Sequence, residues 1–120
     1  MLLVRTYLAP SRVHGIGLFA AEPISRGTII WRFDERIDRR FRKAEIDAMP
    51  EPLKSYLGTY SYPEAIGSET YLLDGDHARF MNHSDQPNTD ATVDTVAIRD
   101  IAAGEELLCD YREFHPTHAL

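Results

Sequence analysis

A ten-residue stretch at positions 79–88, RFMNHSDQPN, constrains this 120-residue chain more than any other feature of its sequence. Its Asn82 and His83 follow two apolar residues, and such a polar pair alone is more often a loop or polar core feature than a ligand site. Two other segments accompany it, GIGLFA at positions 15–20 and GEELLCDY at positions 104–111. Each segment alone is a weak indication, but their order and separations together restrict both fold and function.

Short stretches rich in β-branched and aromatic residues, bounded by Gly, Pro, Asn or Asp, predict a chain dominated by short strands. The predicted strands cover residues 3–8, 18–20, 28–32, 70–73, 89–98 and 106–109. A hairpin turn is expected at Asp94 and Thr95, inside the fifth of them. The strands are short and unevenly spaced, and the predicted helices are confined to the middle of the chain. This pattern favours a β-rich α+β fold over a doubly wound α/β fold.

Two helices are predicted at residues 43–49 and 51–57, within a short helical insert at about residues 38–60. Pro50 and Pro52 mark the break between the two helices. A basic cluster leads into them, and its members are Arg36, Arg39, Arg40, Arg42 and Lys43. Because acidic residues alternate with these cations, we interpret the cluster as a solvated helix face.

Two segments share the pattern Ile-x-x-Gly followed by a run that contains apolar residues, at positions 24–29 and 101–107. Gly27 and Gly104 are expected to supply turns with positive φ before a strand. Two copies are too few for a solenoid repeat. They predict two similar turn-to-strand units within one domain.

Size and charge exclude several classes of protein. A chain of 120 residues is one domain, residues 1–120, near the small end of what can bury a single core. No apolar run approaches the ~20 residues of a membrane helix. The formal net charge of −6 argues against direct nucleic-acid binding and favours a cationic peptide as partner. Cys109 is the only cysteine, so an intrachain disulfide and a cysteine-based zinc cluster are excluded, which fits an intracellular, cytoplasmic protein.

The Gly15-Ile16-Gly17 segment is open to two interpretations. It does not continue to the G-x-x-G spacing of a dinucleotide site, and Pro23 follows where a helix would be needed. It is either a glycine turn between strands or a loop whose missing side chains let backbone groups approach a ligand closely.

Together, the three motifs resemble the signature motifs of SET domains, the lysine methyltransferase fold that uses S-adenosylmethionine, over residues 11–114. The resemblance implies several short curved β-sheets and a C-terminal pseudoknot, in which the C-terminal segment passes through a loop. It implies a protein-lysine N-methyltransferase that acts on a histone or another basic protein. The residues that it implies as cofactor contacts are Gly15, Ile16, Gly17, Asn82, His83 and Tyr111.

The same resemblance implies that Tyr111 is the catalytic residue. Methyl transfer from a sulfonium to an amine is an in-line displacement, and at pH 7 the neutral form of lysine costs roughly 4.6 kcal/mol. A dry channel and the positive cofactor both disfavour the ammonium. The protein must then supply alignment, so Tyr111 fits an orienting role better than that of a general base. Asp110 and Glu106 are expected to hold the knot together.

The lysine channel of the family is aromatic, and Tyr56, Tyr60, Tyr62 and Tyr71 lie in the segment where relatives carry channel tyrosines. Of these we assign Tyr56 and Tyr60 to the channel, together with Cys109 and Phe114. Cys109 stands where relatives usually have Tyr or Phe, at a position that resembles the switch for the number of methyl groups. Because cysteine is smaller than either, we expect a roomier pocket that permits di- or trimethylation. A buried small hydrophobic residue is the plainer interpretation of Cys109.

The chain departs from the family pattern at three places. Ile16 stands where an aromatic residue is common, and Asp85 stands where many relatives have a zinc-binding cysteine. The cysteine-rich segment that follows the tyrosine in those relatives is also missing, so a zinc-built lid is excluded and no metal is expected. Phe114, His115 or a second subunit must cover that side of the site, or it stays open, and a homodimer would be one answer.

Two other function classes stay open. A SET fold that binds peptide or cofactor without turnover is the first, and the departures at Ile16 and Asp85 favour it. A hydrolase or metal site is the second, built from His77, His83, Asp76 and Asp85. Those spacings match no standard metal motif.

Overall fold

Small sheets and short helices make up the fold. The structure is a computed structural model, and it describes residues 1–114. The strands are β1 (Thr6–Pro10), β2 (Ile16–Ala20), β3 (Ile29–Trp31), β4 (Arg39–Arg42), β5 (Tyr62–Pro63), β6 (Thr70–Leu73), β7 (Asn82–His83), β8 (Thr89–Asp90), β9 (Thr95–Ala97) and β10 (Leu108–Cys109). The helices are α1 (Lys43–Asp47), α2 (Leu53–Tyr60) and the 3-10 turns η1 (His77–Phe80) and η2 (Tyr111–Glu113). The prediction of a β-rich α+β fold is confirmed.

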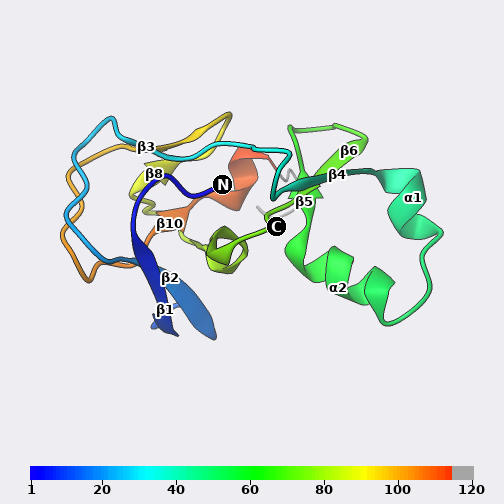
Figure 1. The fold of residues 1–120 in the computed structure, drawn as a ribbon, viewed down its shortest axis with the longest axis horizontal. Coiled ribbons are helices and arrows are strands. Elements are labelled where there is room, and N and C mark those ends of the chain that lie inside the picture. The colour runs from blue at the N-terminus through cyan, green and yellow to red at the C-terminus, as the bar shows by residue number, and fades with distance from the viewer. Residues whose placement is uncertain (115–120) are drawn as a thin grey trace.

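The strands form four sheets. β1 pairs with β2, and two three-stranded sheets have the orders β3-β9-β8 and β4-β6-β5, all with antiparallel pairs. β10 and β7 form the one parallel pair among the named strands. Figure 1 shows β1, β2, β3 and β8 at one end of the molecule and α1, α2, β4 and β6 at the other. η2 lies between these two ends, where a site could draw on both (Figure 1).

One apolar cluster holds the strands of the first end together. Its best-buried large members, Leu18, Ile30, Ile101 and Leu107, are no more than 1% exposed. They come from segments up to 89 positions apart in sequence, so the core depends on long-range pairing. Burying such a side chain stabilises the fold by about 1.5–3 kcal/mol.

The two Ile-x-x-Gly segments pair with each other. The amides of Ile24 and Ile101 each donate to the other residue's carbonyl, both at 2.8 Å. Gly27 and Gly104 have φ values of +86° and +88°, which confirms the positive-φ turns expected from the sequence. This pairing fixes where the C-terminal segment enters the core.

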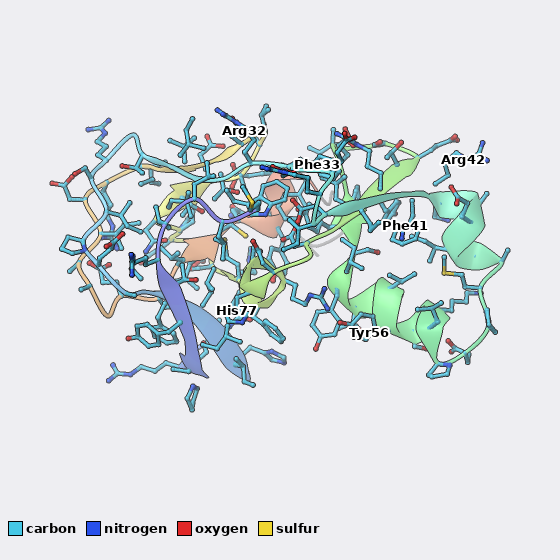
Figure 2. All side chains as sticks on the ribbon, in the orientation of Figure 1. Arg32, Phe33, Phe41, Arg42, Tyr56 and His77 are labelled. Atoms are coloured by element: carbon cyan, nitrogen blue, oxygen red, sulfur yellow. The ribbon has the colours of Figure 1, made fainter. Side chains whose placement is uncertain are left out.

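The interpretation of the basic cluster as a helix face is wrong. Arg39–Arg42 form strand β4, paired antiparallel with β6, and the helix begins only at Lys43. Alternating charge fits an exposed edge strand as well as a helix face, and here the long-range pairing with β6 decides. In Figure 2, Arg42 lies at the outer end of β4, beside α1.

None of the helices in residues 1–114 is long and apolar enough to cross a membrane.

Candidate functional site

A cavity of about 550 Å³ lies where the helical insert meets the C-terminal segment. Its wall draws residues from β3, α2, β5, β10 and the segment that follows β10. Its lining residues include Tyr60, Tyr62, Asp74, Cys109, Tyr111 and Phe114. The cavity is large enough for a flexible side chain and part of a second ligand.

Tyr111 is fixed at both of its ends. Its hydroxyl donates to the carbonyl oxygen of Met81 at 2.6 Å, and its amide donates to Nδ1 of His83 at 3.0 Å. Burial raises the pKa of Tyr111, and electrostatic interactions with Cys109 and Asp74 raise it further. The hydroxyl is therefore protonated at neutral pH and can orient a ligand, but it is a poor proton acceptor.

Asn82 connects the first motif to the third. Its Nδ2 donates to the carbonyls of His14 and Ile16 at 2.9 and 3.3 Å, and to Oε2 of Glu106 at 3.1 Å. The carboxylate of Glu106 also accepts from the hydroxyl of Ser11. Residues from all three sequence motifs therefore meet in one hydrogen-bonded cluster.

Gly17 is needed for this close approach. A Cβ at this position would lie 2.4 Å from Oε2 of Glu106, whose carboxylate is held by Ser11 and Asn82. Gly15 has φ of +46°, and a Cβ there would meet nothing within 4 Å. Ile16 between them is half exposed. Gly17 in β2 thus packs closely on Glu106, and Gly15 presents backbone to open space in the turn between the paired strands β1 and β2. The glycine turn between strands is therefore confirmed, and the ligand-holding role stays a prediction.

The segment before Tyr111 is held from two sides. On one side the amide of Leu107 donates to Leu18. On the other, Asn88 binds both the carbonyl of Glu106 and the amide of Leu108, at 2.8 and 2.9 Å. Residues 106–108 are therefore held between β2 and the segment that follows β7.

The aromatic wall is built around Phe114. Its ring lies 5.0 Å from the ring of Tyr62 and 5.7 Å from that of Tyr111, measured between centroids. Tyr60 also lines the cavity. His115, considered as cover for this side, lies outside the described residues.

Tyr56 occupies a different place from its predicted one. It does not line the cavity, and the residue is 40% exposed. Its ring lies tilted against that of Tyr60, with the centroids 4.7 Å apart, and its hydroxyl accepts a hydrogen bond from Arg79. Figure 2 shows it beside α2, between the insert and the rest of the molecule. The structure brings Tyr62 to the cavity in its stead.

Asp74 is a site residue that the sequence interpretation missed. Its Oδ1 accepts a hydrogen bond from the hydroxyl of Tyr62 at 2.6 Å, and Asp74 is 6% exposed. Burial, with smaller contributions from Asp38 and Asp76, raises the pKa of Asp74 to about 7. The only signal in the sequence is an acidic residue directly after an apolar strand.

The two residues before Tyr111, Cys109 and Asp110, differ in their protonation states. Asp110 is paired with Arg112, which lowers the pKa of Asp110 to about 2. Cys109 is buried, and burial raises the pKa of its thiol. Asp110 is thus an ionised partner and Cys109 a neutral small side chain at pH 7.

The metal-site alternative finds no support in the geometry. Within residues 1–114, no three side chains of His, Cys, Asp or Glu are arranged so that they could hold a metal ion. His83 already accepts from the amide of Tyr111. The four residues named for that alternative do not form a ligand set in this part of the chain.

Comparison with known proteins gives consistent matches. The family model described as SET domain matches residues 15–112. The human Histone-lysine N-methyltransferase 2D is 32% identical over 118 residues, which cover 88% of this chain and 2% of that protein. The "Histone-lysine N-methyltransferase, H3 lysine-4 specific" of Eremothecium gossypii is 34% identical over 117 residues, covering 87% of this chain and 12% of that protein. The chain thus spans a small part of the length of these relatives.

A solved structure shares the fold. The humanized mutant of the Chaetomium thermophilum Polycomb Repressive Complex 2 bound to the inhibitor GSK343 aligns with a TM-score of 0.66 at 24% identity. The alignment covers 92% of this chain and 16% of that chain.

Proposed function

The chain belongs to the SET domain family, and from this premise we propose that it is an S-adenosylmethionine-dependent protein-lysine N-methyltransferase. Relatives over nearly the whole chain are named histone-lysine N-methyltransferases. The observation that carries the proposal is the placement of Tyr111, whose hydroxyl is fixed to Met81 in the wall of an aromatic cavity.

The loop at Gly15–Gly17 and the segment at Asn82 and His83 would hold the methyl donor. When bound, S-adenosylmethionine supplies an electrophilic methyl group on a positively charged sulfur. Backbone exposed at Gly15 and the half-exposed Ile16 offer a surface for it, and Asn82 holds this loop against Glu106. No aromatic ring stands at Ile16, so packing on the donor there is aliphatic.

The aromatic cavity would hold the amine. Tyr62, Tyr111 and Phe114 exclude water around an aliphatic chain, and exclusion of water disfavours the charged form of the amine. Tyr111 keeps its proton because burial raises its pKa. Its role is to align the reacting groups, which is worth several kcal/mol in a near-attack geometry.

The substrate would be a lysine in a basic protein, a histone among the candidates. The net charge of −6 attracts cationic segments and disfavours direct nucleic-acid binding as the main activity. An intracellular location and a homodimer that covers the open side of the site are further proposals of the same kind.

The test of this function is a methylation assay on Tyr111→Phe. We expect the wild-type chain, with S-adenosylmethionine and a pool of lysine-rich peptides and histones, to add methyl groups detectable by mass spectrometry. Removing one preorganised hydroxyl is expected to lower the rate about 100-fold. Tyr7→Phe makes the same change on an exposed ring of β1 and should leave the rate unaltered.

Cofactor binding separates the outcomes of this assay. Binding of S-adenosylmethionine without methylation of any protein in the pool would favour a binding module instead. Equal rates for wild type and Tyr111→Phe would remove Tyr111 from the mechanism.

The number of methyl groups tests the expectation for Cys109. This side chain is buried and lines the cavity, and cysteine is smaller than the Tyr or Phe that relatives have at this position. We expect di- or trimethyl-lysine from wild type and mainly monomethyl-lysine from Cys109→Tyr, read from the same mass spectra. Monomethyl-lysine alone from both proteins would contradict it.

A further inference from the structure

Three acidic side chains line the cavity, and one differs from the others. Asp47 is exposed and Glu64 partly exposed, and each is paired with a cation, Asp47 with Lys43 at 3.5 Å and Glu64 with Arg40 at 2.7 Å. Asp74 is buried, and no cation within residues 1–114 forms an ion pair with its carboxylate. A buried carboxylate without a cation is costly, so it needs an explanation.

The two oxygens of Asp74 have different surroundings. Oδ1 accepts the hydroxyl of Tyr62 at 2.6 Å. Oδ2 receives no hydrogen bond from the described residues. It is nevertheless not completely enclosed by protein atoms. Because Asp74 lines the cavity, Oδ2 retains access to that open space. The nearby guanidinium of Arg79 donates to the main-chain carbonyl of Asp74 and not to its carboxylate.

Asp74 and Tyr62 belong to the same wall as Tyr111. The ring of Tyr62 packs on Phe114, which packs on Tyr111. The charge of Asp74 also contributes to the raised pKa of both Cys109 and Tyr111. The carboxylate is therefore close enough to act on a ligand that reaches Tyr111.

We propose that Asp74 and Tyr62 form a binding site for the ammonium group of the substrate lysine, with Asp74 as a specificity-determining residue. The inference rests on the proposed function for the identity of the ligand. An ammonium group has three donors and no acceptor. Oδ2 of Asp74 accepts one of them, and the oxygen of Tyr62, whose proton is committed to Oδ1, accepts another.

The site explains how a lysine enters a dry cavity. At neutral pH almost every lysine is protonated. Moving an unpaired ammonium group out of water has a large unfavourable desolvation free energy. A carboxylate in the wall offsets this cost at entry. The proton is not transferred to Asp74 in this proposal, since its function is capture and selection of the cation before the reaction.

Small ligands test the site without reference to turnover. n-Butylammonium and n-butanol have the same chain length and differ in charge. Titrations of the 120-residue protein, followed through the NMR signals of its tyrosine rings, should give tighter binding of the cation by wild type. Asp74→Asn should weaken binding of n-butylammonium about 10-fold or more and leave n-butanol unchanged, because charge-assisted hydrogen bonds are lost. Asp47→Asn, which removes an exposed charge from the same cavity, should change the affinity for neither ligand.

Tyr62→Phe provides a second variant in case Asp74→Asn fails to fold, and it should weaken n-butylammonium binding several-fold. Equal weakening of both ligands by Asp74→Asn would mean a structural role and would overturn the proposal. The proposal would also be overturned if Asp47→Asn weakened n-butylammonium binding as much as Asp74→Asn does. Selective binding of n-butylammonium by a protein that methylates nothing would support the cation site while contradicting the proposed function.

Discussion

Gly75→Ala is expected to lower the free energy of unfolding by more than about 4 kcal/mol, or to prevent folding altogether. A Cβ at Gly75 would lie 1.8 Å from the carbonyl oxygen of Ile37 and 2.6 Å from its carbonyl carbon. Both contacts are with backbone, so no side-chain rotation can relieve them. Moving the backbone would break the hydrogen bond from the amide of Gly75 to the buried carboxylate of Asp38, 2.9 Å long.

Urea unfolding, followed by circular dichroism, measures this change. Gly58→Ala is the matched control, because Gly58 lies in α2 and a Cβ there would meet nothing within 4 Å. Alanine is expected to stabilise the protein at Gly58 by about 0.5–1 kcal/mol through its higher helix propensity. If Gly75→Ala unfolded at the same urea concentration as wild type, the close approach of residues 37 and 75 would be refuted.

This close approach also positions the site. Gly75 stands between Asp74, whose side chain lines the cavity, and Asp76, which caps η1 through the amide of Ala78. The carboxylate of Asp76 also accepts the amide of Leu2. A glycine at this point lets the chain pass Ile37 and still present Asp74 to the cavity.

The convergence of the three motifs could be predicted from the sequence, while several elements could not. Asn82, Glu106 and the Gly15–Gly17 loop come together as the resemblance implied. Strands β5 and β7 have two residues each, too few for any periodicity to be visible. β4 was missed because its charged sequence takes its conformation from pairing with β6, a contact between distant segments.

The cation site illustrates the same limit at the level of side chains. Tyr62 lies opposite Leu72 in the antiparallel β5–β6 pair. Side chains two positions apart on a strand share a face, so this register places Asp74 diagonally across from Tyr62. The sequence contains both residues, but only the register shows that they meet. Tyr56, assigned to the channel from the sequence, lies one helical turn from Tyr60 and contacts its ring, but Tyr56 itself does not line the cavity.

Asp74→Asn is expected to gain stability relative to wild type as the pH rises. Burial holds the pKa of Asp74 at about 7 in the folded protein, whereas an unfolded chain has a value of ~3.9. Because the folded pKa is the higher one, folding is favoured by the protonated acid. That contribution is complete below about pH 4 and is lost as the pH rises through about 7.

The expected size follows from the gap between the two pKa values. Each pKa unit corresponds to about 1.4 kcal/mol, so wild type loses at most about 4 kcal/mol between pH 4 and pH 8 through this group. Asparagine carries no charge, so the stability of Asp74→Asn relative to wild type should rise by about 3–4 kcal/mol over that range. Urea unfolding of both proteins at several pH values measures the difference between their free energies of unfolding. The contributions of all other titrating groups cancel in this difference.

The exposed pair of Asp47 and Lys43 supplies the control. Asp47→Asn should shift stability by no more than about 0.5 kcal/mol at any of these pH values, because solvent screens an exposed ion pair. A constant difference between Asp74→Asn and wild type from pH 4 to pH 8 would show that the carboxylate is not buried as described. The expected slope would instead mean that the chain keeps a destabilising charge at neutral pH. Binding sites commonly trade stability for function in this way, and an ammonium ligand is the kind of partner that would remove the cost.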